Sequence, residues 1–194
     1  MTNSAPLLLA FGDSLTAGYG LQRDHAFPAQ LEALLQPRSP GARVINAGVS
    51  GDTTAGALGR LPRVLSALEK RPDLAIVELG ANDLLRGIPP AATRANLDAI
   101  VAELSRCGIP VLLATFSVPA PFAALAHGYT SIYDDVAAKH GAATVPFFPD
   151  GVLGHSEMVL GDRLHPNARA IDLVARGMLP AVERALAMRY GQAA

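Results

Sequence analysis

The 194-residue sequence contains no tryptophan, a single cysteine and little charge of either sign. Because Cys107 has no second cysteine to pair with, an intrachain disulfide is excluded and the fold depends on its hydrophobic core. Charged residues make up 17% of the chain, the formal net charge is -1, and lysine and arginine form no cluster. The sequence therefore contains no cluster of positive charge that could bind a polyanion, and we expect no nucleic-acid partner.

A long apolar segment is also missing. The N-terminus lacks a basic region, and its apolar run at 7–11 is too short for a secretory signal or a membrane span. We therefore expect no stable membrane insertion. As written, the chain is expected in the cytoplasm; with an export signal ahead of it, the protein would be periplasmic or secreted.

The motifs that hold metals and nucleotides are absent from the sequence. It has no His-Glu-x-x-His, no cysteine cluster and no Gly-x-Gly-x-x-Gly, and the glycine-rich stretch 12–20 lacks the Lys-Ser/Thr of a P-loop. Ser50 lies in Gly-Val-Ser-Gly, but the complete Gly-x-Ser-x-Gly motif of a nucleophile elbow is absent because position 52 is aspartate. We therefore expect neither a catalytic metal nor a dinucleotide cofactor.

What the chain does contain is an alternation of short apolar runs and helical patterns. Half of its residues are hydrophobic, which suffices for a single domain over 1–194 with a substantial core. Runs typical of buried strands lie at 7–11, 43–46, 74–79, 110–115 and 144–147. Strands that alternate with helices imply right-handed parallel crossovers. We therefore expect an α/β fold, a flavodoxin-like three-layer α/β/α sandwich whose five-stranded parallel sheet has the order 2-1-3-4-5.

The helical patterns carry their own start and stop signals. Pro28 suits the first turn of one helix, and the Asp-Thr pair at 52–53 suits the cap of the next, which Pro62 is expected to split into two pieces. Further helices are expected over 90–107 and 122–140, and Pro166 is expected to open the last one.

Candidate functional residues follow four of the predicted strands. Ser14 comes after the first strand, Gly48 after the second and Asn82 after the third, and Asp162 and His165 lie in the loop after the fifth. The carboxyl ends of parallel strands share one edge of a sheet, where ligands bind in open α/β folds. We therefore expect these residues to share one site.

The residue types at this edge suit nucleophilic catalysis. A serine hydroxyl needs a base to take its proton, and that base needs a third group to fix its tautomer. With Asp162 three residues before His165, a tight turn can bring the carboxylate to Nδ1 and leave Nε2 to face Ser14. The backbone N–H groups of Ser14 and Gly48 and the side-chain amide of Asn82 are candidate donors to an oxyanion.

The same residues lie in four sequence blocks. They read Phe-Gly-Asp-Ser-Leu at 11–15, Asn-Ala-Gly-Val-Ser-Gly-Asp-Thr at 46–53, Gly-Ala-Asn-Asp-Leu-Leu-Arg-Gly at 80–87 and Asp-Arg-Leu-His-Pro-Asn at 162–167. In order and spacing they resemble the four conserved blocks of the SGNH (GDSL) hydrolase family. The resemblance is greatest to its bacterial arylesterase and multifunctional thioesterase/lysophospholipase branch, whose members cleave esters and thioesters of varied acyl groups.

The resemblance also implies a role for each site residue. Ser14 would be the nucleophile, His165 the base and Asp162 its orienting group, with Gly48 and Asn82 in the oxyanion hole. One departure from the family pattern is Arg163, where many relatives have glycine.

Each site residue also has a plainer interpretation. Asn82 and Gly48 are ordinary loop residues when taken alone, and Asp162 could cap the helix predicted from Pro166. His155 lies in the same long loop as His165 and is the rival base, although position 152, three before it, is valine and no local carboxylate is expected to partner it. Asp13 is expected to cap the turn that follows it.

Substrate preference depends on two loops, 116–129 and 148–160, that are predicted to flank the catalytic edge. Both carry apolar residues, which favour a small-molecule ester with an apolar acyl or aryl group. A carbohydrate acetylesterase on the same fold and a non-catalytic binding module are the alternatives; the missing tryptophan argues against the first, and the intact set of site residues against the second. The predicted substrate-binding residues are Phe122, Leu125, Val152, Leu153, Met158 and Leu160.

Replacing the two loop histidines separates the candidate bases. His165→Ala is expected to abolish ester hydrolysis because the serine loses its base, whereas His155→Ala is expected to change at most the substrate preference. Hydrolysis of a 4-nitrophenyl ester by the two purified variants measures both effects. An inactive His155 variant beside an active His165 variant would overturn the assignment.

Overall fold

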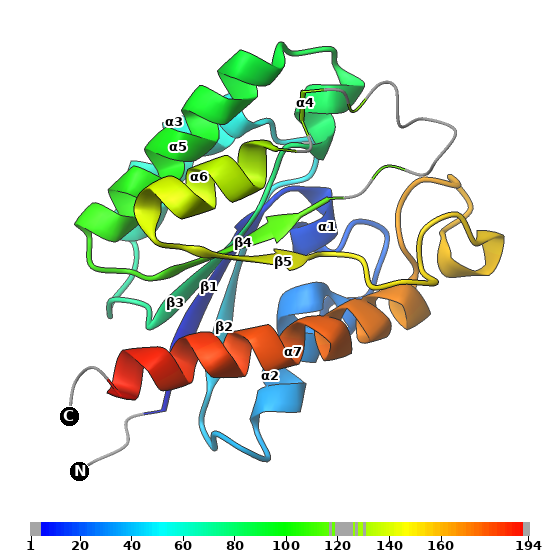
Figure 1. Cartoon of the computed structure of the whole chain (residues 1–194). Coiled ribbons are helices and arrows are strands. Elements are labelled where there is room, and N and C mark those ends of the chain that lie inside the picture. The colour runs from blue at the N-terminus through cyan, green and yellow to red at the C-terminus, as the bar shows by residue number, and fades with distance from the viewer. Residues whose placement is uncertain (1–4, 117, 119–125, 127, 130, 192–194) are drawn as a thin grey trace.

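The computed structural model describes residues 5–116, 118, 126, 128–129 and 131–191. All four strand pairings of its central sheet are parallel, and the order is β2-β1-β3-β4-β5 (Figure 1). This confirms the predicted fold class and strand order. The strands are β1 (Leu7–Gly12), β2 (Arg43–Gly48), β3 (Leu74–Glu78), β4 (Val111–Thr115) and β5 (Ala143–Pro146).

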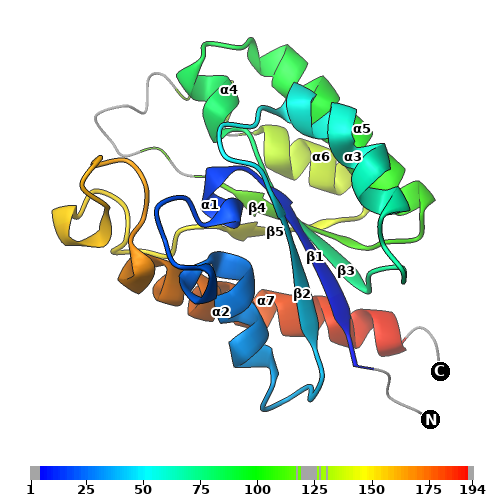
Figure 2. The ribbon, with the colours of Figure 1, turned by 180° about the vertical axis from the view of Figure 1, so that it is seen from behind.

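Helices cover both faces of the sheet, which gives the three expected layers. On one face lie α2 (Phe27–Leu35) and α7 (Ala168–Gly191), and on the other lie α3 (Thr54–Ser66), α5 (Pro90–Arg106) and α6 (Ile132–His140) (Figures 1 and 2). Two short helices, α1 (Ser14–Ala17) and α4 (Ala81–Leu85), follow β1 and β3 at the carboxyl edge. Single 3-10 turns occur at Arg23–His25 and Ser156–Met158.

Side chains of β1 alternate between the two faces. Leu8 and Ala10 pack in the core on the α2 and α7 side, whereas Leu9 and Phe11 pack on the side of α3, α5 and α6. All four are fully buried. Burial on both faces explains why β1 is a continuous apolar run, and it gives the residues after Gly12 a rigid support.

The predicted break at Pro62 is wrong. The helix α3 runs without interruption from Thr54 to Ser66 with Pro62 inside it, and Thr53 caps it as predicted, accepting the N–H of Gly56 at 3.2 Å. Proline removes a helical hydrogen bond and crowds the preceding turn. Here packing on the sheet holds the helix together on both sides of that position, by the fully buried Ala57 and Leu61 before it and the partly buried Val64 and Leu65 after it.

The last helix begins at Ala168, two residues later than predicted. Pro166 forms an isolated antiparallel bridge with Val159, so it belongs to the loop. Asn167 supplies the acceptor for the first turn, because its Oδ1 accepts the N–H of Ala170 at 3.0 Å. The interpretation of Asp162 as the cap of this helix is therefore wrong.

The helix predicted over 122–140 is observed in part. Its second half is α6, which starts at Ile132, and residues 128–129 form a turn. Residues 119–125, 127 and 130 lie outside the described part of the chain. Within the described ranges, no helix combines the length and apolar composition needed to cross a bilayer, and no three His, Cys, Asp or Glu side chains gather into a metal-binding group.

Phe27 tests the core between the sheet and α2. Its ring is fully buried and lies edge-on to Phe147, with 5.5 Å between ring centroids. Phe27→Ala leaves a cavity, and the free energy of unfolding is expected to fall by about 3–5 kcal/mol in urea titrations. Leu173→Ala, on the exposed side of α7, is the control and should change it by less than about 1 kcal/mol. Equal losses in the two variants would contradict the assignment of the core.

Candidate active site

Ser14 is the first helical residue after β1. The strand ends at Gly12, and Asp13 caps α1 because its Oδ1 accepts the N–H of Leu15 at 3.0 Å, which confirms the cap predicted for Asp13. Ser14 thus stands at the carboxyl edge of the sheet and is 8% exposed. The buried strand behind it fixes the position of its hydroxyl group.

Ser14, His165 and Asp162 form a continuous series of hydrogen bonds. His165 Nε2 lies 3.1 Å from Ser14 Oγ, and His165 Nδ1 lies 2.6 Å from Asp162 Oδ2. The other oxygen, Asp162 Oδ1, accepts the backbone N–H groups of Leu164 and His165 at 3.0 Å each. The imidazole is therefore oriented so that it can take the proton of Ser14 while the carboxylate holds its other ring nitrogen.

These hydrogen bonds also fix the charge of Asp162. The N–H of Leu164, followed by the side chain and the N–H of His165, lowers the pKa of the Asp162 carboxyl to about 2. The group is therefore a carboxylate throughout the physiological pH range. An anion in this position stabilises the imidazolium that forms when His165 takes a proton.

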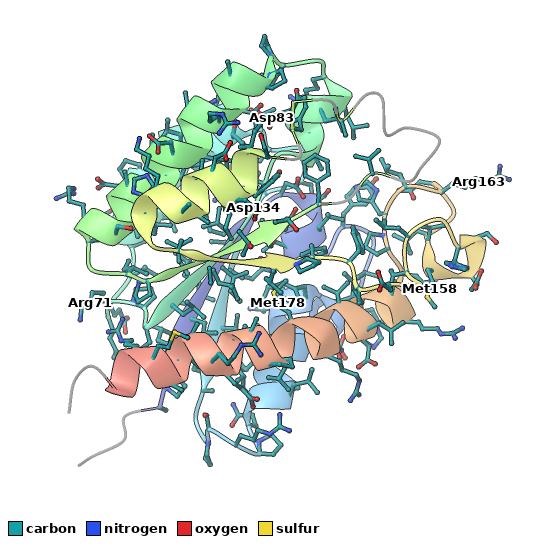
Figure 3. The ribbon with its side chains drawn as sticks, in the orientation of Figure 1. Arg71, Asp83, Asp134, Met158, Arg163 and Met178 are labelled. Atoms are coloured by element: carbon teal, nitrogen blue, oxygen red, sulfur yellow. The ribbon has the colours of Figure 1, made fainter. Side chains whose placement is uncertain are left out.

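Arg163 occupies the strained position in the turn between Asp162 and His165. It is the one described residue other than glycine with a positive φ, at 60°. Glycine enters this left-handed region without strain, whereas arginine adopts it at a cost. This explains why the family pattern has glycine at this position. The side chain of Arg163 points outward from the loop (Figure 3).

Tyr19 packs over the imidazole of His165. The two ring centroids are 4.3 Å apart and the rings are tilted by 35°. Tyr19 is 50% exposed and lines the same cleft as Ser14. The sequence reasoning did not single out Tyr19; the available signal was an aromatic residue between two glycines directly after the Ser14 block.

Asn82 reaches the site from α4, the short helix after β3. Its Nδ2 donates to Asp13 Oδ2 at 2.9 Å, and its side chain lines the cleft beside Ser14. The next residue, Asp83, is fully buried and anchors α4 to α3. Its carboxylate accepts the N–H and hydroxyl of Thr54 at 2.9 and 2.5 Å. The structure therefore brings Asn82 to Ser14, as the sequence predicts.

Gly48, in contrast, does not face the site. Its N–H donates to Asn46 Oδ1 at 3.0 Å, and the residue does not line the cleft. A Cβ at position 48 would lie 2.2 Å from the backbone nitrogen of Ala17. Glycine is therefore required here so that β2 can approach α1 closely, and the oxyanion role predicted for Gly48 is not supported.

Gly51 lies where Gly48 was expected. It lines the cleft with Ser14 and Asn82, has a φ of 78°, and sits in a turn closed by the N–H of Asp52 and the carbonyl of Val49. Its own carbonyl accepts Arg86 Nη2 at 2.6 Å, which ties this turn to the end of α4. Sequence reasoning missed Gly51, although a glycine in the turn between a strand and a helix cap was the signal.

Arg60, on α3, connects the strand ends beneath the site. Its guanidinium donates to Asp52 Oδ2 at 2.7 Å and to the carbonyls of Ala47 and Gly12 at 2.9 Å each. It also lies over the ring of Phe11, 4.3 Å from the centroid. One partly buried cation thereby joins the ends of β1 and β2 and the turn that carries Gly51.

The cleft in front of Ser14 has a volume of about 2070 Å³. Leu153 and Leu160, predicted to bind substrate, line it, but Val152 and Met158 do not. These two are buried against Ala170 of α7, at the inner side of the loop, and Figure 3 shows Met158 near the start of that helix. Phe122 and Leu125 lie outside the described residues. Leu84, Leu85 and Ile88, which the sequence reasoning did not select, line the cleft.

His155 also lines the cleft, but it is not bonded to Ser14. Its Nδ1 lies 3.6 Å from Glu157 Oε1, and both side chains are more than half exposed. The prediction that no local carboxylate partners His155 is therefore wrong, because Glu157 lies two residues after it. The histidine in contact with Ser14 is His165.

A serine linked through a histidine to an aspartate is the arrangement of serine hydrolases. Here it lies at the carboxyl edge of a 2-1-3-4-5 parallel sheet between two helical layers, as in the SGNH-hydrolase fold. Fold and site together define the chain as a serine hydrolase of this class. It belongs to the GDSL-like lipase/acylhydrolase family, whose model matches residues 10–172.

Relatives are similar to this chain over most of its length. Esterase TesA of Pseudomonas aeruginosa is 36% identical, over 93% of this chain and 89% of its own. An arylesterase of Vibrio mimicus is 35% identical, over 87% and 84%. Thioesterase 1/protease 1/lysophospholipase L1 of Escherichia coli K12 is 34% identical, over 90% and 82%.

Solved structures agree with this relationship. The crystal structure of TesA matches with a TM-score of 0.86 and 36% identity, over 92% of this chain and 99% of the other. That of AlinE4, an esterase of the SGNH-hydrolase family, matches with a TM-score of 0.75 and 44% identity, over 94% and 97%. The likeness includes both the fold and the enzyme class.

Asp162→Asn tests the charge behind His165. The variant keeps an oxygen for the N–H groups of Leu164 and His165 but removes the anion at Nδ1. We expect kcat at neutral pH to fall about 10⁴-fold, the usual cost of removing this charge from such a triad. Because the pKa of Asp162 is lowered to about 2, this group stays ionised as the pH falls to about 4. Protonation of Asp162 should therefore cause no loss of wild-type activity above about pH 4. Steady-state kinetics on a 4-nitrophenyl ester measure both, and a variant within tenfold of wild type would contradict the role.

Proposed function

We propose that the chain hydrolyses carboxylic esters through an acyl-enzyme intermediate. Ser14 is the nucleophile, His165 the general base and acid, and Asp162 the group that orients His165. The observation that carries the proposal is the hydrogen-bonded series from Ser14 to Asp162, at 3.1 and 2.6 Å, beside an open cleft. A serine hydroxyl becomes an effective nucleophile when a base is held at this distance.

In the first half of the reaction, Ser14 Oγ attacks the ester carbonyl while His165 Nε2 takes its proton. The oxyanion accepts hydrogen bonds from the N–H groups of Ser14 and Gly51 and from the Asn82 amide. Gly51 takes the role first predicted for Gly48, because it lines the cleft and the N–H of Gly48 is bonded to Asn46. His165 then gives its proton to the leaving alcohol, and the acyl group remains on Ser14.

In the second half, a water molecule replaces the alcohol. His165 Nε2 takes a proton from this water, and the resulting hydroxide attacks the acyl-enzyme carbonyl. The second tetrahedral intermediate collapses, His165 returns its proton to Ser14 Oγ, and the carboxylic acid leaves. Every proton passes between Ser14, His165, the alcohol and water, so the scheme uses no cofactor.

The substrate that fits this site is a small-molecule ester with an aryl group or a short to medium acyl chain. Leucine and isoleucine side chains from two segments line the cleft, namely α4 with the turn after it and the loop after β5: Leu84, Leu85, Ile88, Leu153 and Leu160. The names of the relatives make thioesters and lysophospholipids further candidate substrates.

The two alternative functions are less well supported. A carbohydrate acetylesterase needs polar subsites for a sugar, whereas leucines from both of these segments line this cleft. A non-catalytic binding module needs no base at hydrogen-bond distance from a serine, yet that arrangement is complete here.

Ser14→Ala is expected to lower hydrolysis by at least about 10³-fold, because no other group can form the acyl-enzyme. A sulfonyl fluoride or organophosphate should add one adduct per chain on Ser14, detected by mass spectrometry. Ser50→Ala, which changes another cleft-lining serine, is the control and should still be labelled on Ser14.

The same preparations give the acyl preference when a chain-length series of 4-nitrophenyl esters is compared with acyl-CoA and an aryl acetate. Wild-type rates across that series for Ser14→Ala would refute the mechanism.

A further inference from the structure

Two buried carboxyl groups lie beneath the proposed oxyanion site. Asp13 follows β1 and Glu78 ends β3, and the two residues are 1% and 3% exposed. Gly12 and Glu78 are partners in the pairing of these strands, and the backbone N–H of Asp13 donates to Glu78 Oε2 at 3.4 Å, which places the two carboxyl groups side by side. The reaction described above makes no use of Glu78.

A contact of this kind requires a proton. Two carboxylates side by side in a buried site repel each other, so such a pair holds one proton between them. Arg60 reaches the same strand end at the carbonyl of Gly12 but pairs with Asp52. In the described part of the chain, no basic side chain forms an ion pair with either carboxyl group.

The remaining titratable groups around the pair do not supply that proton. The hydroxyl of Tyr133, on α6, donates to the carbonyl of Leu79 at 2.8 Å. Asp83, on α4, accepts hydrogen bonds from Thr54 and Thr93. His165 favours a negative charge on Asp13 when it is protonated. The proton therefore belongs to Asp13 or Glu78.

The hydrogen bonds assign it to Glu78. Both oxygens of Asp13 accept N–H groups, from Leu15 at 3.0 Å and from the Asn82 amide at 2.9 Å, and such bonds favour the ionised form. In Glu78, Oε2 accepts the hydroxyl of Thr16 at 2.9 Å and the N–H of Asp13 at 3.4 Å. Burial raises the pKa of both carboxyls, and the neighbouring charge of Asp13 helps to raise that of Glu78 well above its usual range.

Asp13 is the residue through which this proton affects the site. One of its oxygens caps the helix that begins with Ser14, and the other holds one N–H of the Asn82 amide. The amide has two N–H groups, so the second is left in a fixed direction for the oxyanion. The site is also shaped for this contact, because a Cβ at Gly12 would lie 2.6 Å from the carbonyl oxygen and 2.8 Å from Oε2 of Glu78.

We propose that Glu78 is a positioning residue for the oxyanion site: its proton, shared with Asp13, holds the Asp13 carboxylate in the orientation that fixes Asn82. The inference rests on the proposed function, since an oriented amide at position 82 matters only if an oxyanion forms there. Glu78 does not line the cleft and does not touch the substrate.

Two substitutions of Glu78 separate the proton from the space that the side chain fills. Glu78→Gln keeps the shape and offers an N–H to Asp13, so we expect kcat within about threefold of wild type. Glu78→Leu fills a similar volume without a donor, and kcat should fall about 10- to 100-fold with KM unchanged. Asn82→Ala removes the donor completely and should lower kcat by about 10²- to 10³-fold, which is the upper limit for the Glu78 variants.

Asp73→Asn is the matched control. Asp73 is also a buried carboxylate beside β3, at the opposite edge of the sheet, bonded to the N–H of Leu7 and paired with Arg189. We expect this variant to lower Tm and to leave kcat unchanged. Steady-state kinetics on a 4-nitrophenyl ester and thermal unfolding are measured on the same preparations.

Infrared spectroscopy gives a readout that is independent of turnover. Wild type at neutral pH should show the carbonyl band of a protonated carboxylic acid, which Glu78→Gln removes and Asp73→Asn retains. Absence of that band would overturn the proposal, even if Glu78→Leu does not fold. A Glu78→Gln variant as slow as a folded Glu78→Leu variant would also overturn it. Full activity of Ser14→Ala would instead refute the proposed function, and the infrared band would still decide whether Glu78 holds a proton.

Discussion

The hydrogen bond between Ser14 and His165 joins residues 151 positions apart, and it depends on the order of the parallel sheet. A single hydrogen bond contributes about 0.5–1.5 kcal/mol, too little to hold distant segments together. The order of the sheet is stabilised by β1, which lies between β2 and β3 and is buried on both faces. Ser14, Gly51 and Asn82 follow these three strands, and the loop after β5 brings His165 to them.

Much of this fold could be predicted because burial on two faces leaves a strong local signal. The three central strands, β1, β3 and β4, are buried almost throughout and appear as short apolar runs, whereas the edge strands β2 and β5 are partly or largely exposed and give shorter runs. The alternation of strands with helices indicates parallel pairing. The errors arise where tertiary contacts outweigh local preference. Pro62 lies within a helix because Leu61 and Ala57 are buried beside it, and Pro166 does not begin a helix because it pairs with Val159.

The site is predictable to different degrees for side chains and for backbone groups. The short spacing of Asp162 and His165 is a local signal, and Ser14 follows a buried strand. Gly48 illustrates the limit. Val49 donates its N–H to Gly12 of β1, so the preceding N–H, that of Gly48, points the other way along an edge strand. No sequence pattern shows which of several glycines in one loop points its N–H toward a nucleophile.

The predicted substrate-binding residues show a similar limit. Val152 and Met158 are apolar residues of the expected loop, but a loop of this length has an inner side that packs on α7 and an outer side that lines the cleft. The sequence identifies the loop as apolar without dividing its residues between those two sides. Leu153 and Leu160 face the cleft because they lie on the outer side.

Arg60 links the turn beside Ser14 to the central sheet. Its guanidinium joins carbonyls near the ends of two neighbouring strands, those of Gly12 and Ala47, to Asp52, in the turn that carries Gly51. If that turn opened alone, the guanidinium and a carboxylate that is 10% exposed would lose their partners. Local unfolding of the turn is therefore coupled to disruption of the sheet, and the loop beside the nucleophile belongs to the same cooperative unit as the core strands.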